Sequence, residues 1–136
     1  MNNKLPPCCY RVSIKALIFK DEKILLIKEA DGRWSLPGGG LEVGESFSSA
    51  VTRELEEEIG VKATKVSSQP LYTWTLVSVN KHGNLVPKVI LAFVVETDSF
   101  NFKNDSSESV EINFFSKLEI LTLDLHPNAQ ELCKVL

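Results

Sequence analysis

Three glutamates in one short stretch, Glu54, Glu57 and Glu58, are the residues of this chain whose type and spacing could do chemistry. On an α-helix, with about 3.6 residues per turn, they share one side, whereas Glu56 points well away from it. Carboxylates that close repel one another unless water or divalent cations neutralise them. Mg²⁺ and Mn²⁺ prefer carboxylate, carbonyl and water oxygens. The glutamates therefore indicate either the solvated face of a surface helix or a metal site that handles phosphate.

A glycine-rich segment, residues 38–40, comes shortly before these glutamates. Because glycine has no side chain, its backbone carbonyl and N–H groups can approach such a site closely. We expect irregular backbone over residues 37–40. Arg53 stands three and four positions before Glu56 and Glu57, so it could brace the helix or reach Glu45 across the loop.

The helix that positions the glutamates is predicted from Phe47 to Ile59. Ser46 can cap its free N–H groups, and Gly60 stands where a left-handed terminal residue is wanted. An apolar stripe would fix the helix to a sheet, and its members are Phe47, Ala50, Val51, Leu55 and Ile59. The glutamates adjoin this stripe, so we expect their carboxylates in a partly desolvated groove at the edge of the buried face.

The remaining segments predict strands around this helix and a second helix at the C-terminus. Apolar and β-branched patterns predict a hairpin from residues 12–18 and 24–27, an extended piece at 34–36, strands at 62–79 and 87–96 joined by a loop at 80–84, and a strand at 110–115. A loop is expected at 100–109 and a short helix at 127–135. This order predicts an α/β fold with a mixed β-sheet and the central helix on one face.

The composition is that of one domain over residues 1–136. The chain is 43% hydrophobic and 24% charged, with a net charge of −3, so a small ligand is a more natural partner than nucleic acid. The apolar run 89–95 is too short to span a bilayer, and the N-terminus lacks the apolar region of a signal peptide. We therefore expect a cytoplasmic protein without a membrane partner. Its three cysteines have neither a disulfide nor a metal-ligand spacing.

Seven residues around the glutamates stand at a fixed spacing that would arise by chance on the order of once per billion start points. They are Gly39, Glu45, Arg53, Glu54, Glu57, Glu58 and Gly60. The stretch from Gly39 to Val61 resembles the Nudix box, Gly-x5-Glu-x7-Arg-Glu-U-x-Glu-Glu-x-Gly-U with U aliphatic, at every position. Residues 34–38 just upstream also resemble the usual lead-in of that family.

The resemblance implies a Nudix-type α/β/α sandwich and a hydrolase that cleaves a pyrophosphate link in a nucleotide, using Mg²⁺ or Mn²⁺ and an activated water. Glu54, Glu57 and Glu58 would then be metal ligands together with the carbonyl of Gly38. Glu54 is our choice for the general base. Arg53 belongs with the catalytic residues, and the supporting residues would be Gly39, Glu45 and Gly60. Many relatives carry an extra base or ligand later in the chain, for which Glu108 and Glu111 are the candidates.

The substrate is not specified by the box. Nucleoside triphosphates and nucleotide sugars such as ADP-ribose both fit a nucleotide pyrophosphatase. Trp34, Tyr72 and Trp74 could stack on a base, although strand aromatics more often belong to the core. A non-catalytic nucleotide-sensing module would be expected to lack a glutamate of the box, and an RNA-end pyrophosphohydrolase to show a basic groove. Family members are often dimers, so a homodimer is a possibility.

Overall fold

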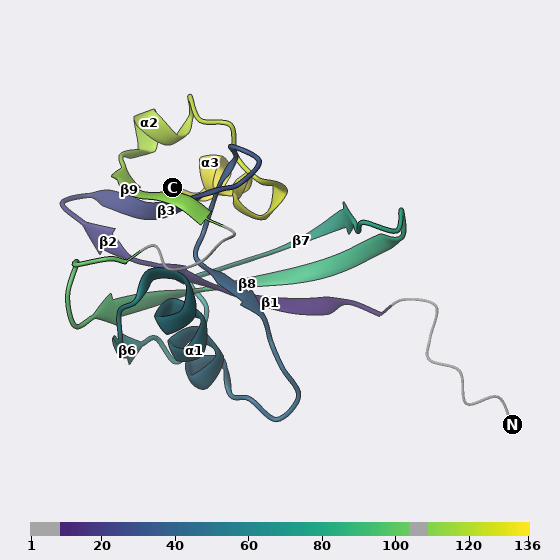
Figure 1. Cartoon of the computed structure of the whole chain (residues 1–136), viewed down its shortest axis with the longest axis horizontal. Coiled ribbons are helices and arrows are strands. Elements are labelled where there is room, and N and C mark those ends of the chain that lie inside the picture. Colours follow the sequence, from purple (N-terminus) through teal and green to yellow (C-terminus); the bar gives the residue numbers. More distant parts are fainter. Residues whose placement is uncertain (1–8, 104–108) are drawn as a thin grey trace, which may run out of the picture.

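The computed structural model describes residues 9–103 and 109–136, which form two β-sheets between one long helix and three short ones (Figure 1). The first sheet has the order β5-β1-β8-β6, with β7 also paired to β8. Its strands are β5 (Gly38–Gly40), β1 (Arg11–Leu17), β8 (Leu85–Thr97), β6 (Ala63–Val66) and β7 (Tyr72–Val79). β1 runs parallel to β8 and antiparallel to β5, so this sheet is mixed, as the sequence predicts.

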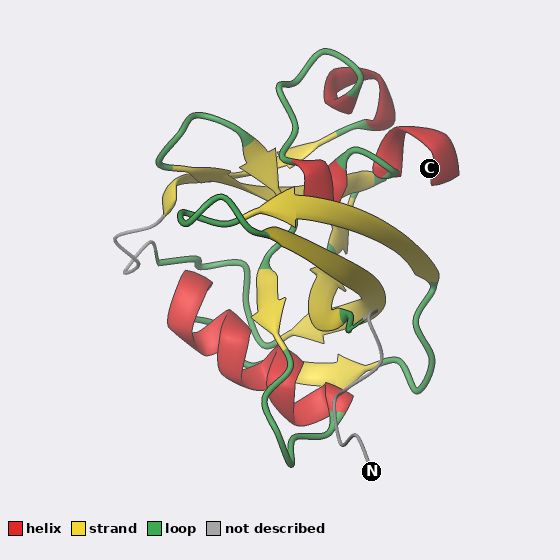
Figure 2. Ribbon diagram, turned by 90° about the vertical axis from the view of Figure 1, so that its right-hand side faces the viewer, coloured by secondary structure: helices red, strands yellow, loops and turns green. Residues whose placement is uncertain are grey.

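The second sheet has the order β2-β3-β4, with β9 also paired to β3. Its strands are β2 (Phe19–Lys20), β3 (Lys23–Glu29), β4 (Trp34–Ser35) and β9 (Ser109–Phe115). The helical elements are α1 (Phe47–Ile59), α2 (Lys117–Ile120), the 3₁₀ turn η1 (Pro127–Ala129) and α3 (Leu132–Val135). Figure 2 shows α1 on one side of the sheets and the short helices on the other, which confirms the mixed α/β architecture.

Helix α1 has the predicted bounds because both of its ends are encoded locally. The hydroxyl of Ser46 accepts a hydrogen bond from the Ser49 N–H at 3.1 Å, and Gly60 ends the helix with a φ of 68°. Four stripe residues are buried against the first sheet, namely Ala50, Val51, Leu55 and Ile59. Phe47 is 42% exposed, so the predicted stripe is one residue too long.

Two predictions about the first forty residues need correction. The expected hairpin of residues 12–18 with 24–27 forms only next to its turn at Asp21, where β2 pairs with β3 and the Leu25 N–H donates to the Ile18 carbonyl at 3.0 Å. The rest of the first segment does not pair with β3 because β5 and β8 occupy the two edges of β1. Residues 38–40 form strand β5 instead of irregular backbone. A Cβ at Gly38 would overlap the carbonyl oxygen of Ile14 and come within 2.9 Å of the Lys15 Cα. Glycine therefore permits this close strand pairing.

Later elements are more divided than predicted. The strand expected at 62–79 is two strands, β6 and β7, whereas the loop at 80–84 does join β7 to β8. The predicted C-terminal helix is divided into η1 and α3. Helix α2 was not predicted, although Ser116 and Glu119 form a capping box at its start. None of the helices among the described residues has the length and apolarity to cross a bilayer.

Candidate active site

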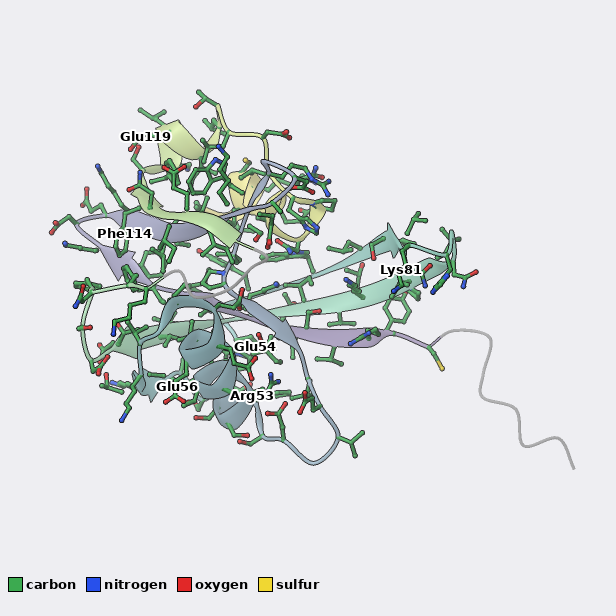
Figure 3. All side chains as sticks on the ribbon, in the orientation of Figure 1. Arg53, Glu54, Glu56, Lys81, Phe114 and Glu119 are labelled. Carbon is green, nitrogen blue, oxygen red and sulfur yellow. The ribbon has the colours of Figure 1, made fainter. Side chains whose placement is uncertain are left out.

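Arg53 is the centre of a polar network that ties α1 to the loop before it. Its Nε and Nη2 atoms donate to the two carboxylate oxygens of Glu45 at 2.8 and 2.9 Å. Its Nη1 donates to Oε1 of Glu54 at 2.9 Å, and Nη2 reaches the carbonyl oxygen of Gly40 at 3.3 Å. Figure 3 shows Arg53 and Glu54 on the side of α1 toward that loop, with Glu56 on the other side. The guanidinium therefore fixes the direction of the Glu54 carboxylate.

The charges in this network stabilise one another. The hydrogen bonds from Arg53 lower the pKa of the Glu45 carboxyl, and the same bonds raise the pKa of the Arg53 guanidinium further above its usual value. The fork of an arginine can hold a carboxylate with two bonds and still reach a third acceptor, which the point charge of a lysine cannot do. Arg53 can accordingly position Glu45 and Glu54 at once.

The carboxylates of Glu54 and Glu58 on α1 lie against the glycines of β5. The N–H of Gly38 donates to Oε1 of Glu58 at 2.7 Å. A Cβ at Gly39 would lie 2.5 Å from Oε1 of Glu54 and 2.9 Å from its Oε2. The missing side chain at residue 39 thus leaves room for the Glu54 carboxylate directly against the strand. Burial raises the pKa of Glu58 to about 8, against the opposing effects of Lys15 and the Gly38 N–H.

The oxygen donors at this site fit a hard divalent cation, although they are not gathered around one point. Among residues 9–103 and 109–136, no three Asp, Glu, His or Cys side chains form a ready metal-binding group. The side chain of Glu54 is 14% exposed and bonded to Arg53, whereas that of Glu57 is 59% exposed. Partial burial, expected for all three glutamates, therefore holds for Glu54 and Glu58 but not for Glu57.

Lys15 is a site residue that the sequence analysis did not find. It lies on β1 directly opposite Gly38, is only 7% exposed, and donates from Nζ to the Gly38 carbonyl oxygen at 3.1 Å. Burial lowers the pKa of its ammonium group, while the nearby carboxylates of Glu58, Glu29 and Glu54 act in the opposite direction. Its only signal in the sequence is a charged residue inside an apolar strand, where alternation predicts a solvent-facing position.

A surface hollow of about 370 Å³ opens beside this network. Its walls come from the start of β1 and from the loop before α1, and the lining residues are Tyr10, Arg11, Val12, Leu41, Glu42, Val43, Gly44 and Glu45. The Arg11 guanidinium comes so close to Gly40 that a Cβ there would lie 2.8 Å from Nη2. A ligand in this hollow would meet both an arginine and the edge of the Glu45–Arg53 pair.

The model of the NUDIX domain matches residues 10–135. The chain belongs to the NUDIX family.

Relatives of this Nudix chain include enzymes that act on different nucleotides. It is 30% identical over 109 residues to the uncharacterized Nudix hydrolase YvcI of Bacillus subtilis, covering 79% of this chain and 66% of that protein. It is 29% identical over 126 residues to an RNA pyrophosphohydrolase of Orientia tsutsugamushi, covering 90% and 70%. A segment of 54 residues is 46% identical to the ADP-ribose pyrophosphatase of Methanocaldococcus jannaschii, covering 37% and 32%. The matches to the first and third of these proteins span less than two thirds of their length.

Solved structures support the same assignment. The solution structure of the Escherichia coli ORF135 protein superposes on this Nudix chain with a TM-score of 0.74 at 26% identity, covering 92% of this chain and 86% of the other. This likeness agrees with the assignment of the chain to the NUDIX family.

The predicted site residues outside the Nudix box are scattered. Glu108 lies outside the described residues, and Glu111 is exposed on β9, in register with Lys28 of the second sheet. Trp34 is buried in the core, with its ring 4.7 Å from that of Phe115. The side chains of Tyr72 and Trp74 are half-buried and pack on the same core cluster. The role of the two glutamates as an extra base or ligand, and that of the three aromatic residues in binding substrate, stay predictions.

Proposed function

We propose that this Nudix chain is a metal-dependent pyrophosphohydrolase that cleaves the phosphoanhydride link of a small nucleotide. The observation that carries the proposal is the contact between α1 and β5. Arg53 holds the Glu54 carboxylate against Gly39, and Glu58 accepts a hydrogen bond from the Gly38 N–H. Two acidic side chains therefore lie against glycine backbone that carries no side chain. Nucleoside triphosphates and nucleotide sugars such as ADP-ribose are the substrates that this site supports best.

Glu54, Glu57, Glu58 and the Gly38 carbonyl would hold Mg²⁺ or Mn²⁺. A bound cation of this kind screens the charge of the phosphate oxygens and lowers the pKa of a water molecule. Glu54 takes the proton from the attacking water, and its hydrogen bond from Arg53 keeps the carboxylate aimed in one direction. Glu45 in turn fixes the Arg53 guanidinium through two bonds. Gly60 supports this arrangement by ending α1 in the left-handed conformation.

The hollow lined by Tyr10 and Arg11 supports binding of the part of a nucleotide that does not react. The Arg11 guanidinium could pair with a phosphate, and the Tyr10 ring could contact a base. The likeness to an RNA pyrophosphohydrolase makes the 5′ end of RNA a second candidate substrate. The net charge of −3 favours the small nucleotide, because affinity for RNA depends largely on contacts from cations to phosphates.

The substrate test is a panel of nucleoside triphosphates, ADP-ribose, other nucleotide sugars and a 5′-triphosphate RNA oligonucleotide. Each is incubated with Mg²⁺ and with Mn²⁺, and the products are identified so that the cleaved bond is known. Faster turnover of a mononucleotide or nucleotide sugar than of RNA is expected. Binding of these nucleotides without turnover of any would instead indicate the non-catalytic sensing module.

The residue test compares Glu57→Gln and Glu58→Gln with the control Glu56→Gln. The first two should abolish turnover and leave the melting temperature nearly unchanged, because Gln keeps the size of the side chain and an oxygen acceptor for the Gly38 N–H. Glu56 is exposed on the other side of α1, so its variant should keep full activity (Figure 3). Retained activity in both Glu57→Gln and Glu58→Gln would refute the assigned roles.

The cellular setting is also part of the proposal. We place the chain in the cytoplasm as a single Nudix domain over residues 1–136, and we keep the homodimer as its possible state of assembly. Light scattering after size-exclusion chromatography measures that state directly, and a monomeric mass would remove the dimer.

A further inference from the structure

Lys15 brings an ammonium group into direct contact with the candidate site. A buried lysine is costly unless its ammonium group is paired, because the charged form loses its hydration. Here Nζ donates to the Gly38 carbonyl oxygen at 3.1 Å, and the carboxylates of Glu58, Glu29 and Glu54 favour its charge. These neighbours offset the cost of burial only in part, because burial has the larger effect and the pKa of Lys15 is lowered on balance.

Lys15 shares its surroundings with the groups proposed for the metal. Its one hydrogen-bond acceptor among the described residues is the Gly38 carbonyl, and the carboxylates of Glu58 and Glu54 act on its charge without a direct bond. The N–H of Gly38 also donates to Glu58 at 2.7 Å, so Gly38 contacts the Glu58 carboxylate with its N–H and the Lys15 ammonium group with its carbonyl. An ammonium group at this point and a divalent cation on the Gly38 carbonyl would repel each other strongly.

We propose that Lys15 is a resident counter-ion that competes with a divalent cation for the Gly38 carbonyl and the neighbouring glutamates. It stabilises the crowded carboxylates when the cation is absent and weakens the binding of the cation when it arrives. Uptake of metal then requires Nζ to leave the Gly38 carbonyl. The inference rests on the proposed metal site and adds the residue that sets the affinity of that site.

Calorimetric titration with MnCl₂ and no nucleotide tests the proposal on the full chain. Lys15→Met removes the charge and keeps a side chain of similar length, so it should tighten Mn²⁺ binding by about tenfold or more. The control Lys81→Met removes the same charge at the tip of the β7–β8 hairpin, far from α1 (Figure 3), and should leave the affinity within about twofold of the wild type, because screening weakens distant charges. Lys15→Arg keeps the charge and should not tighten binding.

The sign of the change separates this role from a merely structural one. If Lys15 only supports the fold, its removal loosens the site and weakens Mn²⁺ binding, so an unchanged or weaker affinity in Lys15→Met overturns the proposal. Should Lys15→Met fail to fold by circular dichroism, Lys15→Gln is titrated in the same way.

A measurement on the wild type needs no variant. The ¹⁵N resonance of the Lys15 ammonium group should shift on addition of Mg²⁺, whereas that of Lys81 should not, and an unshifted Lys15 resonance overturns the proposal. Absence of Mn²⁺ uptake by both wild type and Lys15→Met would overturn the proposed metal site together with this inference. Uptake by the wild type that Lys15→Met leaves unchanged would overturn this inference alone.

Discussion

Replacement of Gly38 by alanine should destabilise the protein through the backbone of β5. Gly38 has a φ of 136°, which costs an alanine about 1–3 kcal/mol. The new Cβ would also overlap the carbonyl oxygen of Ile14 and lie 2.9 Å from the Lys15 Cα, and neither atom can rotate away. Opening β1 from β5 would lose strand hydrogen bonds at about 1 kcal/mol each. The total is about 3 kcal/mol or more, from a typical stability of about 5–15 kcal/mol.

The neighbouring glycines are matched controls for this effect. Gly40→Ala brings its Cβ to 2.8 Å from Nη2 of Arg11, the end of a flexible exposed side chain, so its melting temperature should change little. The nearest atoms to a Cβ in Gly39→Ala all belong to the Glu54 carboxylate, with Oε1 at 2.5 Å. This variant should fold but lose turnover by about a hundredfold, since a catalytic group displaced by about 1 Å can cost that much.

The assay is thermal unfolding of the three variants beside turnover of the best substrate. Gly38→Ala should lower the melting temperature by about 10 °C or more, given a few degrees per kcal/mol for a chain of this size. Gly40→Ala should resemble the wild type in melting temperature. A melting temperature of Gly38→Ala equal to that of Gly40→Ala would refute the reasoning from close backbone approach.

Two further predictions concern charges at the same site. Arg53→Lys keeps the charge but cannot bridge Glu45 and Glu54, so turnover should fall about a hundredfold. Because Arg53 is partly exposed, the free energy of unfolding should fall by only about 1–2 kcal/mol. Turnover equal to that of the wild type would contradict this prediction. The raised pKa of Glu58, about 8, means that the folded protein binds its proton more tightly than the unfolded chain does. The stability that Glu58 contributes is therefore complete below its unfolded pKa and is lost as the pH rises from there through about 8. The melting temperature of the metal-free protein should fall as the pH rises over this interval, and it should fall less in Glu58→Gln. Equal slopes of melting temperature against pH in the two proteins would argue against the raised pKa of Glu58.

The sequence predicts α1 well because its determinants are local. Ser46, Gly60 and the spacing of Val51, Leu55 and Ile59 act within the helix or at its ends, and no distant segment is needed to interpret them. The box pattern locates the acidic residues for the same reason. The Arg53–Glu45 bond, which was one of two alternatives for Arg53, spans eight residues and is present in the structure.

Strand β5 and Lys15 could not be predicted in this way because both depend on tertiary contacts. A run of glycines has no strand propensity, and residues 38–40 are extended only because β1 lies beside them at close range. Alternation in β1 predicts that Lys15 faces solvent. Lys15 is nevertheless buried and lies near carboxylates of α1 and β3, which no local pattern reports.

The parallel pairing of β1 with β8 joins two segments that are synthesised at different times. β1 leaves the ribosome early, but its partners from Lys88 to Val94 are synthesised far later. Until they arrive, the nascent β1 can pair only with the glycine strand on its other edge. Long-range pairing of this kind is slow to form. Catalytic competence should consequently appear only after residues 88–94 have been synthesised.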